Sequence, residues 1–231
     1  MIAKPVVNGV YLLSFGFVNA FLIDAGELTL IDTGVEGSEH KILRALEELG
    51  KSPSDLRHIL ITHLHADHTG GMAALKKASG ATTYMHPLDA ADYSQGITMR
   101  PIQPGAGLLG GLMAGIFSRG QNYRMNAAPV DQSLEDGQVL DFAGGLRVIH
   151  APGHTAGQVV FLLPTQGGVL FVGDACGHLA RLGLSPIYED REQGQRTLRM
   201  LAGLDFQTVC FSHGKPMVSQ AKQQFIAKFA R

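Results

Sequence analysis

The feature that most constrains this chain is a dense group of ligand-type side chains directly behind an apolar run. Residues 58–62 are predicted to form a buried strand, and they lead into His63, His65, Asp67 and His68. At a strand end, His63 and His65 point to the same side because side chains alternate with a period of two. Imidazole and carboxylate groups are the ligands expected for zinc and other first-row divalent metals. We therefore expect a metal site here rather than a solvated polar turn.

Short apolar runs alternate with turn signals in both halves of the chain, which is typical of strands and helices in succession. Strand character is strongest over residues 6–13, 17–23, 28–31, 58–62, 82–85, 146–151, 159–163, 169–172 and 208–211. Helical spacing marks residues 38–50, 70–79, 194–201 and 218–230. Two sets of strands, each followed by helices, predict an α/β fold of four layers in one domain over residues 1–231, with two sheets face to face and helices outside.

Residues 96–129 interrupt this pattern and are predicted to form an insert of helix or loop between the two halves. A loop this long inside a compact domain is usually functional or carries structure of its own, so we expect a lid. Its apolar run 108–113 is broken by glycines and suits an acyl chain or a partner subunit, which makes a homodimer one expectation. Four side chains near the ends of the insert are candidates to contact a substrate carboxylate or phosphate, with ordinary surface positions as the alternative: Arg100, Arg119, Tyr123 and Arg124.

Charge and composition exclude several kinds of partner. Lys and Arg total 19 against 20 Asp and Glu, which argues against a phosphate-neutralising surface for nucleic acid. Residues 106–117 form the most apolar run, which is well short of the ~20 residues that a membrane span requires. The start of the chain lacks a basic, apolar leader, and only two cysteines are present. We therefore expect a cytoplasmic protein that acts on a small molecule, with neither membrane nor nucleic acid as partner.

Four motifs, taken together and in order, resemble those of the metallo-β-lactamase-fold superfamily. His-Leu-His-Ala-Asp-His at 63–68 is followed by Pro-Gly-His-Thr at 152–155, Gly-Asp at 173–174 and Ser-His-Gly at 212–214. The resemblance covers nearly the whole chain and implies that family's fold with a dinuclear metal centre. It implies seven ligands, of which three bind one metal, three bind the second and the last bridges both: His63, His65 and His154; Asp67, His68 and His213; and Asp174.

By this resemblance the centre holds two divalent ions, with zinc expected first and iron or manganese as alternatives because His and Asp accept all three. A metal lowers the pKa of a bound water from 15.7 toward ~7, so hydroxide is available at neutral pH. Asp67 is also expected to act in catalysis, by orienting the hydroxide or by passing a proton to the leaving group. The predicted function is hydrolysis of an ester-like bond by the bridging hydroxide.

Other polar residues are assigned supporting or structural roles. Asp32 in Ile-Asp-Thr-Gly resembles an early aspartate of the family that supports the metal loop, and the alternative is a turn residue before a helix. His178, four residues past Asp174, is a candidate to line the pocket. The remaining histidines and both cysteines are not expected to bind metal: His40, His58, His86, His150, Cys176 and Cys210.

Within the superfamily, the Pro-Gly-His-Thr and Gly-Asp motifs resemble the glyoxalase II-like thioester hydrolases most. Residues 214–231 are too few for that branch's C-terminal helical domain with its glutathione contacts, so a compact, single-domain relative is expected. Lactonases of the acyl-homoserine-lactone type share the seven ligands but carry a tyrosine where this chain has Gly177. A lactone is therefore the second expectation and a phosphodiester the third. Asp174 at the bridging position counts against β-lactamase activity.

Two alternatives come from other functional classes. A sulfur dioxygenase of the superfamily binds one iron through two histidines and the bridging aspartate, so the ligand motif fits both chemistries. Residues 175–180 do not resemble the arginine-containing segment of that branch. A metal-binding module without activity is disfavoured because all seven ligand positions are filled. Thioester hydrolysis therefore remains the first expectation.

Overall fold

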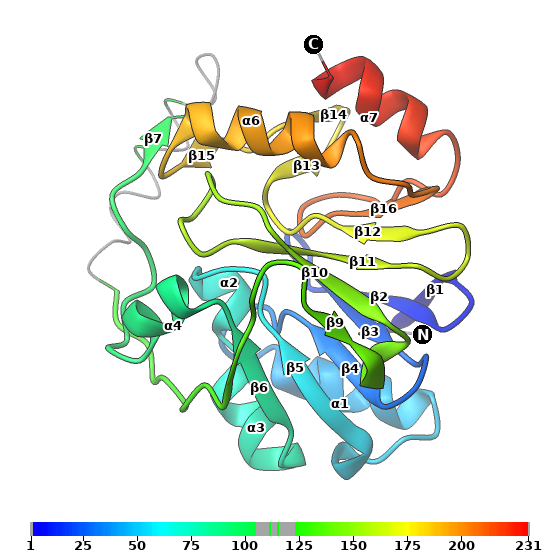
Figure 1. Ribbon diagram of the computed structural model, residues 1–231. Helices are drawn as coiled ribbons and strands as arrows, with labels where there is room; N and C mark the ends of the chain where they lie inside the picture. Colours follow the sequence, from blue (N-terminus) through cyan, green and yellow to red (C-terminus); the bar gives the residue numbers. More distant parts are fainter. Residues whose placement is uncertain (1, 105–110, 112–114, 116–122, 231) are drawn as a thin grey trace.

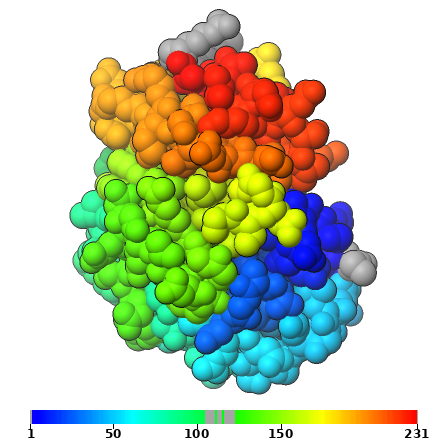
Figure 2. All heavy atoms as spheres, turned by 45° about the vertical axis from the view of Figure 1, so that its right-hand side comes forward, coloured from blue at the N-terminus to red at the C-terminus, as the bar shows by residue number. Residues whose placement is uncertain are grey.

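The computed structural model describes residues 2–104, 111, 115 and 123–230 of the chain. Its elements form four layers in the order helices, sheet, sheet, helices (Figure 1). In the space-filling view, the C-terminal helices (orange to red) cover one end and the N-terminal half (blue to cyan) forms the other (Figure 2). The predicted α/β fold with two sheets between outer helices is confirmed. Within the described ranges, every helix is too short or too polar to cross a bilayer.

The first sheet has seven strands in the order β1-β2-β3-β4-β5-β6-β8. Antiparallel pairing joins the first four strands, and parallel pairing joins β4, β5, β6 and β8. The strands are β1 Ala3–Val7, β2 Val10–Ser14, β3 Asn19–Ile23, β4 Leu28–Ile31, β5 Leu56–Leu60, β6 Thr82–Met85 and β8 Gln132–Ser133. Helices α1 (Glu39–Glu48) and α3 (Met72–Ser79) pack on the outer face, and the 3₁₀ turn η1 (Pro53–Asp55) leads into β5.

The second sheet has five strands in the order β16-β12-β11-β10-β9. All its pairs are antiparallel except β12 with β16, which run parallel. The strands are β9 Val139–Leu140, β10 Leu146–His150, β11 Val159–Leu163, β12 Val169–Phe171 and β16 Thr208–Cys210, with the 3₁₀ turn η3 (Asp141–Ala143) between β9 and β10. Helices α6 (Arg191–Leu201) and α7 (Ala221–Phe229) cover its outer face (Figure 1).

A layer of large apolar side chains fills the space between the two sheets. Phe21 of the first sheet packs edge-on against Phe171 of the second, with ring centroids 5.4 Å apart. Leu60 and Phe161 belong to the same buried cluster. Full burial of a side chain of this size contributes about 1.5–3 kcal/mol. This layer therefore fixes how the two sheets, and the loops at their ends, lie relative to each other.

The structure differs from the predicted elements where short segments depend on tertiary contacts. Residues 6–13 form two strands rather than one, because the chain reverses at Asn8-Gly9, where Gly9 has a φ of +74°. The predicted helix 70–79 forms as α3, and a short additional helix, α2 (Ala66–Thr69), lies ahead of it. Additional elements are α4 (Pro87–Tyr93), the hairpin β13 (Cys176–His178) with β14 (Leu182–Leu184), and the pair β15 (Ile187–Tyr188) with β7 (Gln103–Pro104). Strands of two or three residues are too short for a recognisable periodicity.

The predicted insert at 96–129 is described only at its two ends, and Arg119 and most of the run 108–113 lie outside the described residues. The two ends lie side by side, since the Met125 amide donates to the Gly96 carbonyl at 3.1 Å and Ile97 pairs with Arg124. The first end continues into β7, which pairs with β15 beside α6. A lid and a homodimer both stay predictions.

Candidate metal centre

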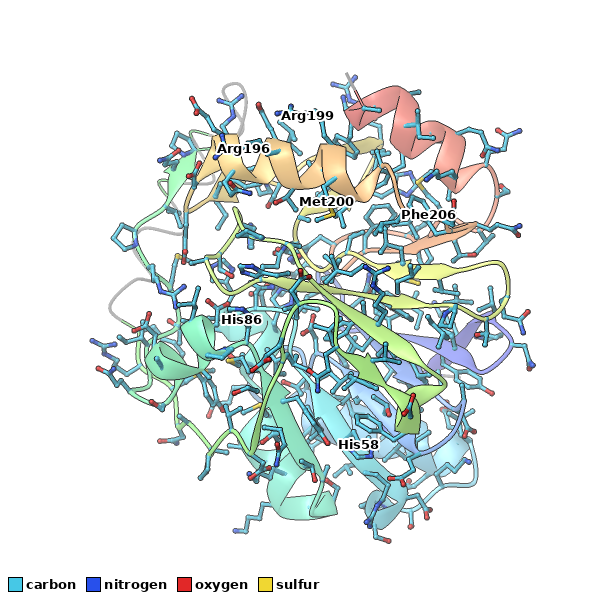
Figure 3. All side chains as sticks on the ribbon, viewed as in Figure 1. His58, His86, Arg196, Arg199, Met200 and Phe206 are labelled. Atoms are coloured by element: carbon cyan, nitrogen blue, oxygen red, sulfur yellow. The ribbon has the colours of Figure 1, made fainter. Side chains whose placement is uncertain are left out.

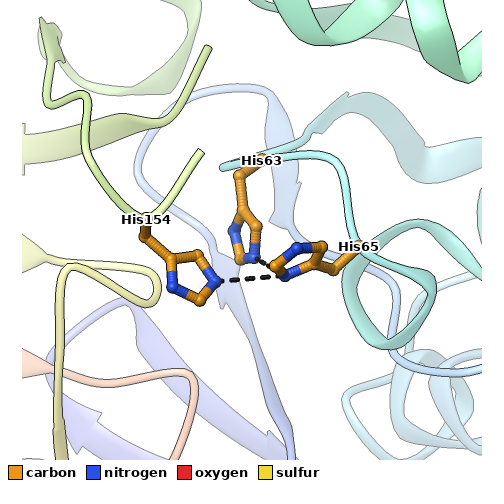
Figure 4. A group of neighbouring side chains, drawn as sticks. All are labelled: His63, His65 and His154. Atoms are coloured by element: carbon orange, nitrogen blue, oxygen red, sulfur yellow. Dashed lines mark hydrogen bonds between the residues drawn. The ribbon is translucent and has the colours of Figure 1, made fainter. Parts of the chain in front are cut away.

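Three buried imidazoles converge at the end of the first sheet. His63 follows β5, His65 begins α2, and His154 lies in the loop between β10 and β11. The Nδ1 atom of His65 lies 3.0 Å from Nε2 of His63 and 3.1 Å from Nε2 of His154 (Figure 4). All three side chains are almost entirely shielded from solvent. The two loops that carry them belong to different halves of the chain, as the sequence predicts.

The hydrogen-bond partners assign the tautomers of two of these rings. The Thr62 hydroxyl donates to Asp32, so it accepts from Nδ1 of His63 at 3.0 Å. Nδ1 of His154 donates to the Ile187 carbonyl at 2.9 Å. The rings of His63 and His154 therefore each turn an unprotonated Nε2 toward Nδ1 of His65. If Nδ1 of His65 carries a proton, that proton can bond to only one of the two Nε2 atoms. A cation between the three nitrogens satisfies all of them, so this donor set fits a metal ion.

A second group lies beside the first. Nδ1 of His68 donates to Asp32 at 2.8 Å, and Nδ1 of His213 donates to the Phe17 carbonyl at 2.7 Å. Their Nε2 atoms face carboxylates, because Nε2 of His213 lies 3.1 Å from Asp174 and 3.4 Å from Asp67. Nε2 of His68 lies 3.7 Å from Asp174. Both Nε2 of His68 and Oδ1 of Asp174 are buried without a hydrogen-bond partner, which is expected of atoms whose partner is an ion.

The structure thus brings together all seven side chains that the sequence singles out. Their ligand atoms form three overlapping groups, each with its atoms within 4.8 Å of one another: His63, His65 and His154; His63, His68 and Asp174; Asp67, His68 and His213. Asp174 contacts members of both outer groups, since it also lies 3.5 Å from Nε2 of His154. The cluster thus contains the seven side chains that the sequence analysis names as ligands, and the number of ions and the ligands of each stay predictions.

Charge in the metal-free centre is balanced by protons. Burial lowers the pKa of His68, but Asp67, Asp32 and Asp174 outweigh burial and raise that pKa to about 9. Burial likewise lowers the pKa of His213, but Asp174 and Asp67 raise it to about 11. In contrast, burial together with the nearby His154 lowers the pKa of His65 to about 3. Two of the five imidazoles are therefore cationic at neutral pH, and a metal must displace their protons.

Asp32 supports this centre from a strained backbone position. Its φ is +61°, which is uncommon for a residue with a side chain, and its carboxylate is fully buried. It accepts hydrogen bonds from the Thr62 amide at 2.8 Å, from the Thr62 hydroxyl and from His68. The carboxylate therefore orients His68 directly and His63 through Thr62. Of the two roles open to Asp32, the structure supports that of an acceptor behind the ligands.

Sequence reasoning missed Asp89, which holds the two histidine loops together. This buried carboxylate on α4 accepts from the Leu64 amide at 2.8 Å, the Thr155 hydroxyl at 2.7 Å and the Gly157 amide at 3.0 Å. Leu64 separates His63 from His65, and Thr155 follows His154, so Asp89 connects both sides of the first histidine group. A Cβ on Gly157 would lie 2.5 Å from this carboxylate, which explains the glycine.

Arg100 is bound within the protein rather than free to meet a substrate. Its guanidinium donates to Asp89 at 2.8 Å, to Glu189 at 3.1 Å and to Asp92 at 2.5 Å. Glu189 in turn accepts from the Ala156 amide at 2.7 Å, next to the loop that carries His154. The expectation that Arg100 contacts a substrate carboxylate or phosphate is therefore replaced by a structural role. It balances the charge of Asp89, which no local sequence pattern indicates.

The other candidates lie away from the ligand cluster. The Tyr123 hydroxyl donates to Glu36, and Nδ1 of His178 donates to the Lys215 carbonyl at 2.9 Å, so neither points at the cluster. His178 does not line the cavity described below, although its neighbours Gly177 and Leu179 do. The histidines expected to be structural are accounted for by other contacts: His58 lies between Glu27 and Tyr84, His86 stacks on His150 with centroids 4.4 Å apart, and His40 is exposed beside Glu39 (Figure 3).

A cavity of about 240 Å³ opens directly over the cluster. His65, Asp67, Asp174 and His213 form its polar floor. Its walls come largely from residues 176–187, which include the hairpin β13–β14 and the loop into β15. Cys176 lies in this wall and is buried, and Cys210 is in the core, as predicted for both. Sequence reasoning missed the hairpin because each of its two strands has only three residues, too few for a recognisable periodicity.

Comparison with known proteins agrees with this geometry. The family profile of the "Metallo-beta-lactamase superfamily" matches residues 13–213. The chain is 34% identical over 160 residues to the uncharacterized protein YobT of Bacillus subtilis, covering 68% of this chain and 61% of that protein. Identity is 30% over 200 residues to a hydroxyacylglutathione hydrolase of Cereibacter sphaeroides, covering 84% and 61%. It is 28% over 205 residues to the thioesterase pkgB of Emericella nidulans, covering 87% and 47%.

The chain therefore spans less than two thirds of the length of these curated relatives. Among solved structures, a β-lactamase from Chitinophaga pinensis superposes with a TM-score of 0.69 at 26% identity, covering 92% of this chain and 78% of that one.

We predict that Asp89→Asn weakens metal binding at the first histidine group. The asparagine amide is neutral, so it cannot balance the charge of Arg100. Its NH₂ group also donates hydrogen bonds at a place where a carboxylate oxygen of Asp89 accepts them. Loss of a supporting hydrogen bond of this kind lowers metal affinity about 10–100-fold. Zinc competition against a chelator measures this change. Asp92→Asn is the matched control. Asp92 is also on α4 and also accepts from Arg100, but its side chain has no hydrogen bond to either histidine loop. Equal zinc affinity in the two variants would show that Asp89 does not position the ligands.

A second prediction concerns proton release. His68 and His213 titrate at about 9 and about 11 in the metal-free protein, so zinc binding at pH 7 displaces about two protons. Calorimetry in buffers of different ionisation enthalpy counts them. Both pKa values are raised above the unfolded value of 6.5, so the stability that these groups give the metal-free protein is complete below pH 6.5. It is lost as the pH rises through about 9 and then about 11. Metal-free protein whose stability is unchanged over that interval contradicts the assignment.

Proposed function

The chain belongs to the metallo-β-lactamase superfamily of metal-dependent hydrolases, and from that premise we propose that it hydrolyses thioesters at a dinuclear metal centre. One observation carries the proposal. Five imidazoles and two carboxylates form overlapping ligand groups at the floor of a cavity that a substrate can enter. The proposed ligands are those of the sequence analysis, with His63, His65 and His154 at one ion, Asp67, His68 and His213 at the other, and Asp174 between them.

The donor set supports two divalent cations, with zinc as the first candidate. Imidazoles dominate the first group and suit zinc, while the second adds carboxylates that accept zinc, iron or manganese. Nε2 of His68 and Oδ1 of Asp174 are buried without a hydrogen-bond partner, which supports a role for both atoms as metal ligands. Such ions, when bound, lower the pKa of a bound water toward ~7 and polarise a carbonyl oxygen.

Asp67 is the residue placed to carry a proton. Hydrolysis adds water across the C–S bond, so one proton must leave the water and reach the departing sulfur. In the protein without metal, burial raises the pKa of Asp67, but the protonated His68 and His213 outweigh burial and lower it to about 2, so the carboxylate is ionised before a metal binds. Its side chain is 21% exposed and forms part of the cavity floor. Asp67 therefore combines access to the substrate with a base that is free to accept and return the proton.

The choice of thioester rests on the relatives and on the cavity. Two relatives carry the names hydroxyacylglutathione hydrolase and thioesterase. A carbonyl placed over the cluster would direct its two substituents along walls that are mostly apolar. Such walls suit an acyl group better than the charged backbone of a phosphodiester. We also propose a cytoplasmic location and a small-molecule substrate, since the net charge is −1 and both cysteines are free and buried.

The test is a substrate panel with metal analysis. We expect about two equivalents of zinc per chain and hydrolysis of S-acyl thioesters in preference to lactones, phosphodiesters and β-lactams. Asp67→Asn and His68→Ala should lower kcat by about 10²–10⁴-fold, as the loss of a proton-transfer group or a metal does. His40→Ala is the matched control, because that side chain is 82% exposed and remote from the cluster.

Three outcomes would overturn the proposal. Full thioesterase activity in Asp67→Asn at unchanged metal content would remove the proton-carrying role. A preference for lactones over thioesters would move the function to lactone hydrolysis. One equivalent of iron, with oxygen consumption on a persulfide, would identify a dioxygenase instead.

A further inference from the structure

The cavity over the metal centre has a chemical character that thioester hydrolysis alone does not require. Above the polar floor, its walls are built from large apolar side chains of four different segments: Phe17, Met99, Leu179, Leu184, Pro186 and Ile187. They come from the β2–β3 loop, the first end of the 96–129 insert, the β13–β14 hairpin and the loop into β15. Segments this distant in sequence converge only in the folded protein.

Above the floor, the described side chains of the lining that carry a polar or thiol group are those of Cys176, Arg181 and Ser185. The Ser185 hydroxyl lies 3.2 Å from Nδ1 of His154 and belongs to the support of that ring. Arg181 is exposed at the mouth of the cavity. Along the apolar stretch formed by Leu179, Leu184, Pro186 and Ile187, a substrate hydroxyl would therefore meet no polar side chain, and burying an unpaired hydroxyl is unfavourable. The walls discriminate in favour of an unsubstituted hydrocarbon chain.

Two of the wall residues are exposed although they are large and apolar. The side chain of Leu179 is 76% exposed and that of Phe17 is 59% exposed. The β2–β3 loop and the hairpin are tied to the same ligand, because His213 donates to the Phe17 carbonyl and its own carbonyl accepts from the His178 amide at 2.9 Å. Both exposed side chains thus lie at one mouth, where a chain longer than the cavity would cover them.

We propose that this cavity is an acyl-binding subsite, and that the substrate is a thioester of an apolar, unsubstituted acyl chain rather than of a short hydroxyacyl group. The proposal rests on the thioester hydrolase function proposed above. The carbonyl lies over the cluster, the chain runs along Leu184 and Ile187, and its end reaches Leu179 and Phe17 at the mouth. Removal of each methylene from water by these walls should strengthen transition-state binding about fourfold.

The kinetic test uses S-acyl-N-acetylcysteamines from acetyl to octanoyl, which share one thiol. We expect kcat/KM to rise about fourfold per methylene until the walls are filled. The 6-hydroxyoctanoyl thioester should be a poorer substrate than the octanoyl thioester, because its hydroxyl lies along the apolar walls and is buried unpaired. A rate that is independent of chain length, or a preference for the hydroxyacyl compound, overturns the inference.

Variants locate the effect in the cavity wall. Leu179→Ser should lower kcat/KM for the octanoyl thioester about tenfold and flatten the dependence on chain length, and Phe17→Ala should act in the same direction. Met200→Ser is the matched control, since Met200 is also a large apolar side chain, 42% exposed, and lies on α6 outside the cavity lining (Figure 3). A loss in Met200→Ser equal to that in Leu179→Ser would show a general effect of surface polarity and overturn the inference.

A binding measurement separates this inference from the proposed function. The ketone 2-nonanone carries the same seven-carbon chain as an octanoyl group but contains no bond to hydrolyse. We expect it to bind the metal-loaded protein more tightly than 2-butanone, and to lose that advantage in Leu179→Ser but not in Met200→Ser. If 2-nonanone binds more tightly as expected but no thioester is cleaved, the acyl-binding subsite is supported and the proposed thioesterase function is wrong. If thioesters are cleaved but both ketones bind with equal affinity, the proposed thioesterase function is supported and the acyl-binding subsite is wrong.

Discussion

The structure depends on one electrostatic constraint, the burial of carboxylates and imidazoles close together at one point. Several of their atoms, Nε2 of His68 and Oδ1 of Asp174 among them, have no hydrogen-bond partner among the described residues. Asp32, Asp67 and Asp174 place negative charge at the centre, and the nitrogens of His63 and His154 turn lone pairs toward it. Protons on His68 and His213 supply the compensating charge in the metal-free protein. Divalent ions supply it in an active hydrolase. Charge compensation therefore links the stability of this end of the molecule to its chemistry.

The two-sheet architecture explains how one point collects ligands from the whole chain. Strands β4 and β5 run parallel, so Asp32 and His63 emerge at the same edge of the first sheet. Strands β12 and β16 are parallel in the second sheet and deliver Asp174 and His213 in the same way. The apolar layer between the sheets, with Phe21 against Phe171, holds the two edges in contact. Ligands from either sheet alone would form only part of the centre.

Support for the ligands follows the same division. Asp32 orients His68 and, through Thr62, His63, and it is local to the first sheet. Asp89 instead bridges the loops of the two halves and relies on Arg100 to balance its charge. The walls of the cavity come from elements outside both sheets, chiefly the hairpin β13–β14. Under the proposed function, metal binding and substrate choice belong to separate parts of the fold, which allows one to vary without the other.

The sequence by itself determined the fold class and which seven side chains gather at one point. The density of histidine and aspartate at 63–68 behind a buried strand, together with the later motifs, identified all seven clustered side chains. Long apolar runs such as β5 and β11 were recognisable because their burial is encoded in consecutive residues.

Only the tertiary structure decided what lies around the ligands. Asp89 and Arg100 form an ion pair in the folded chain. Nothing in residues 87–100 distinguishes them from ordinary charged surface residues, so the sequence did not indicate that Asp89 supports the histidine loops or that Arg100 balances its charge. The two-residue turn at Gly9 and the short strands of the cavity wall are likewise stabilised by partners distant in sequence. Ligand identity is a property of side-chain type and spacing, which the sequence carries. Charge pairing and cavity shape arise from distances between segments, which exist only after the sheets have packed.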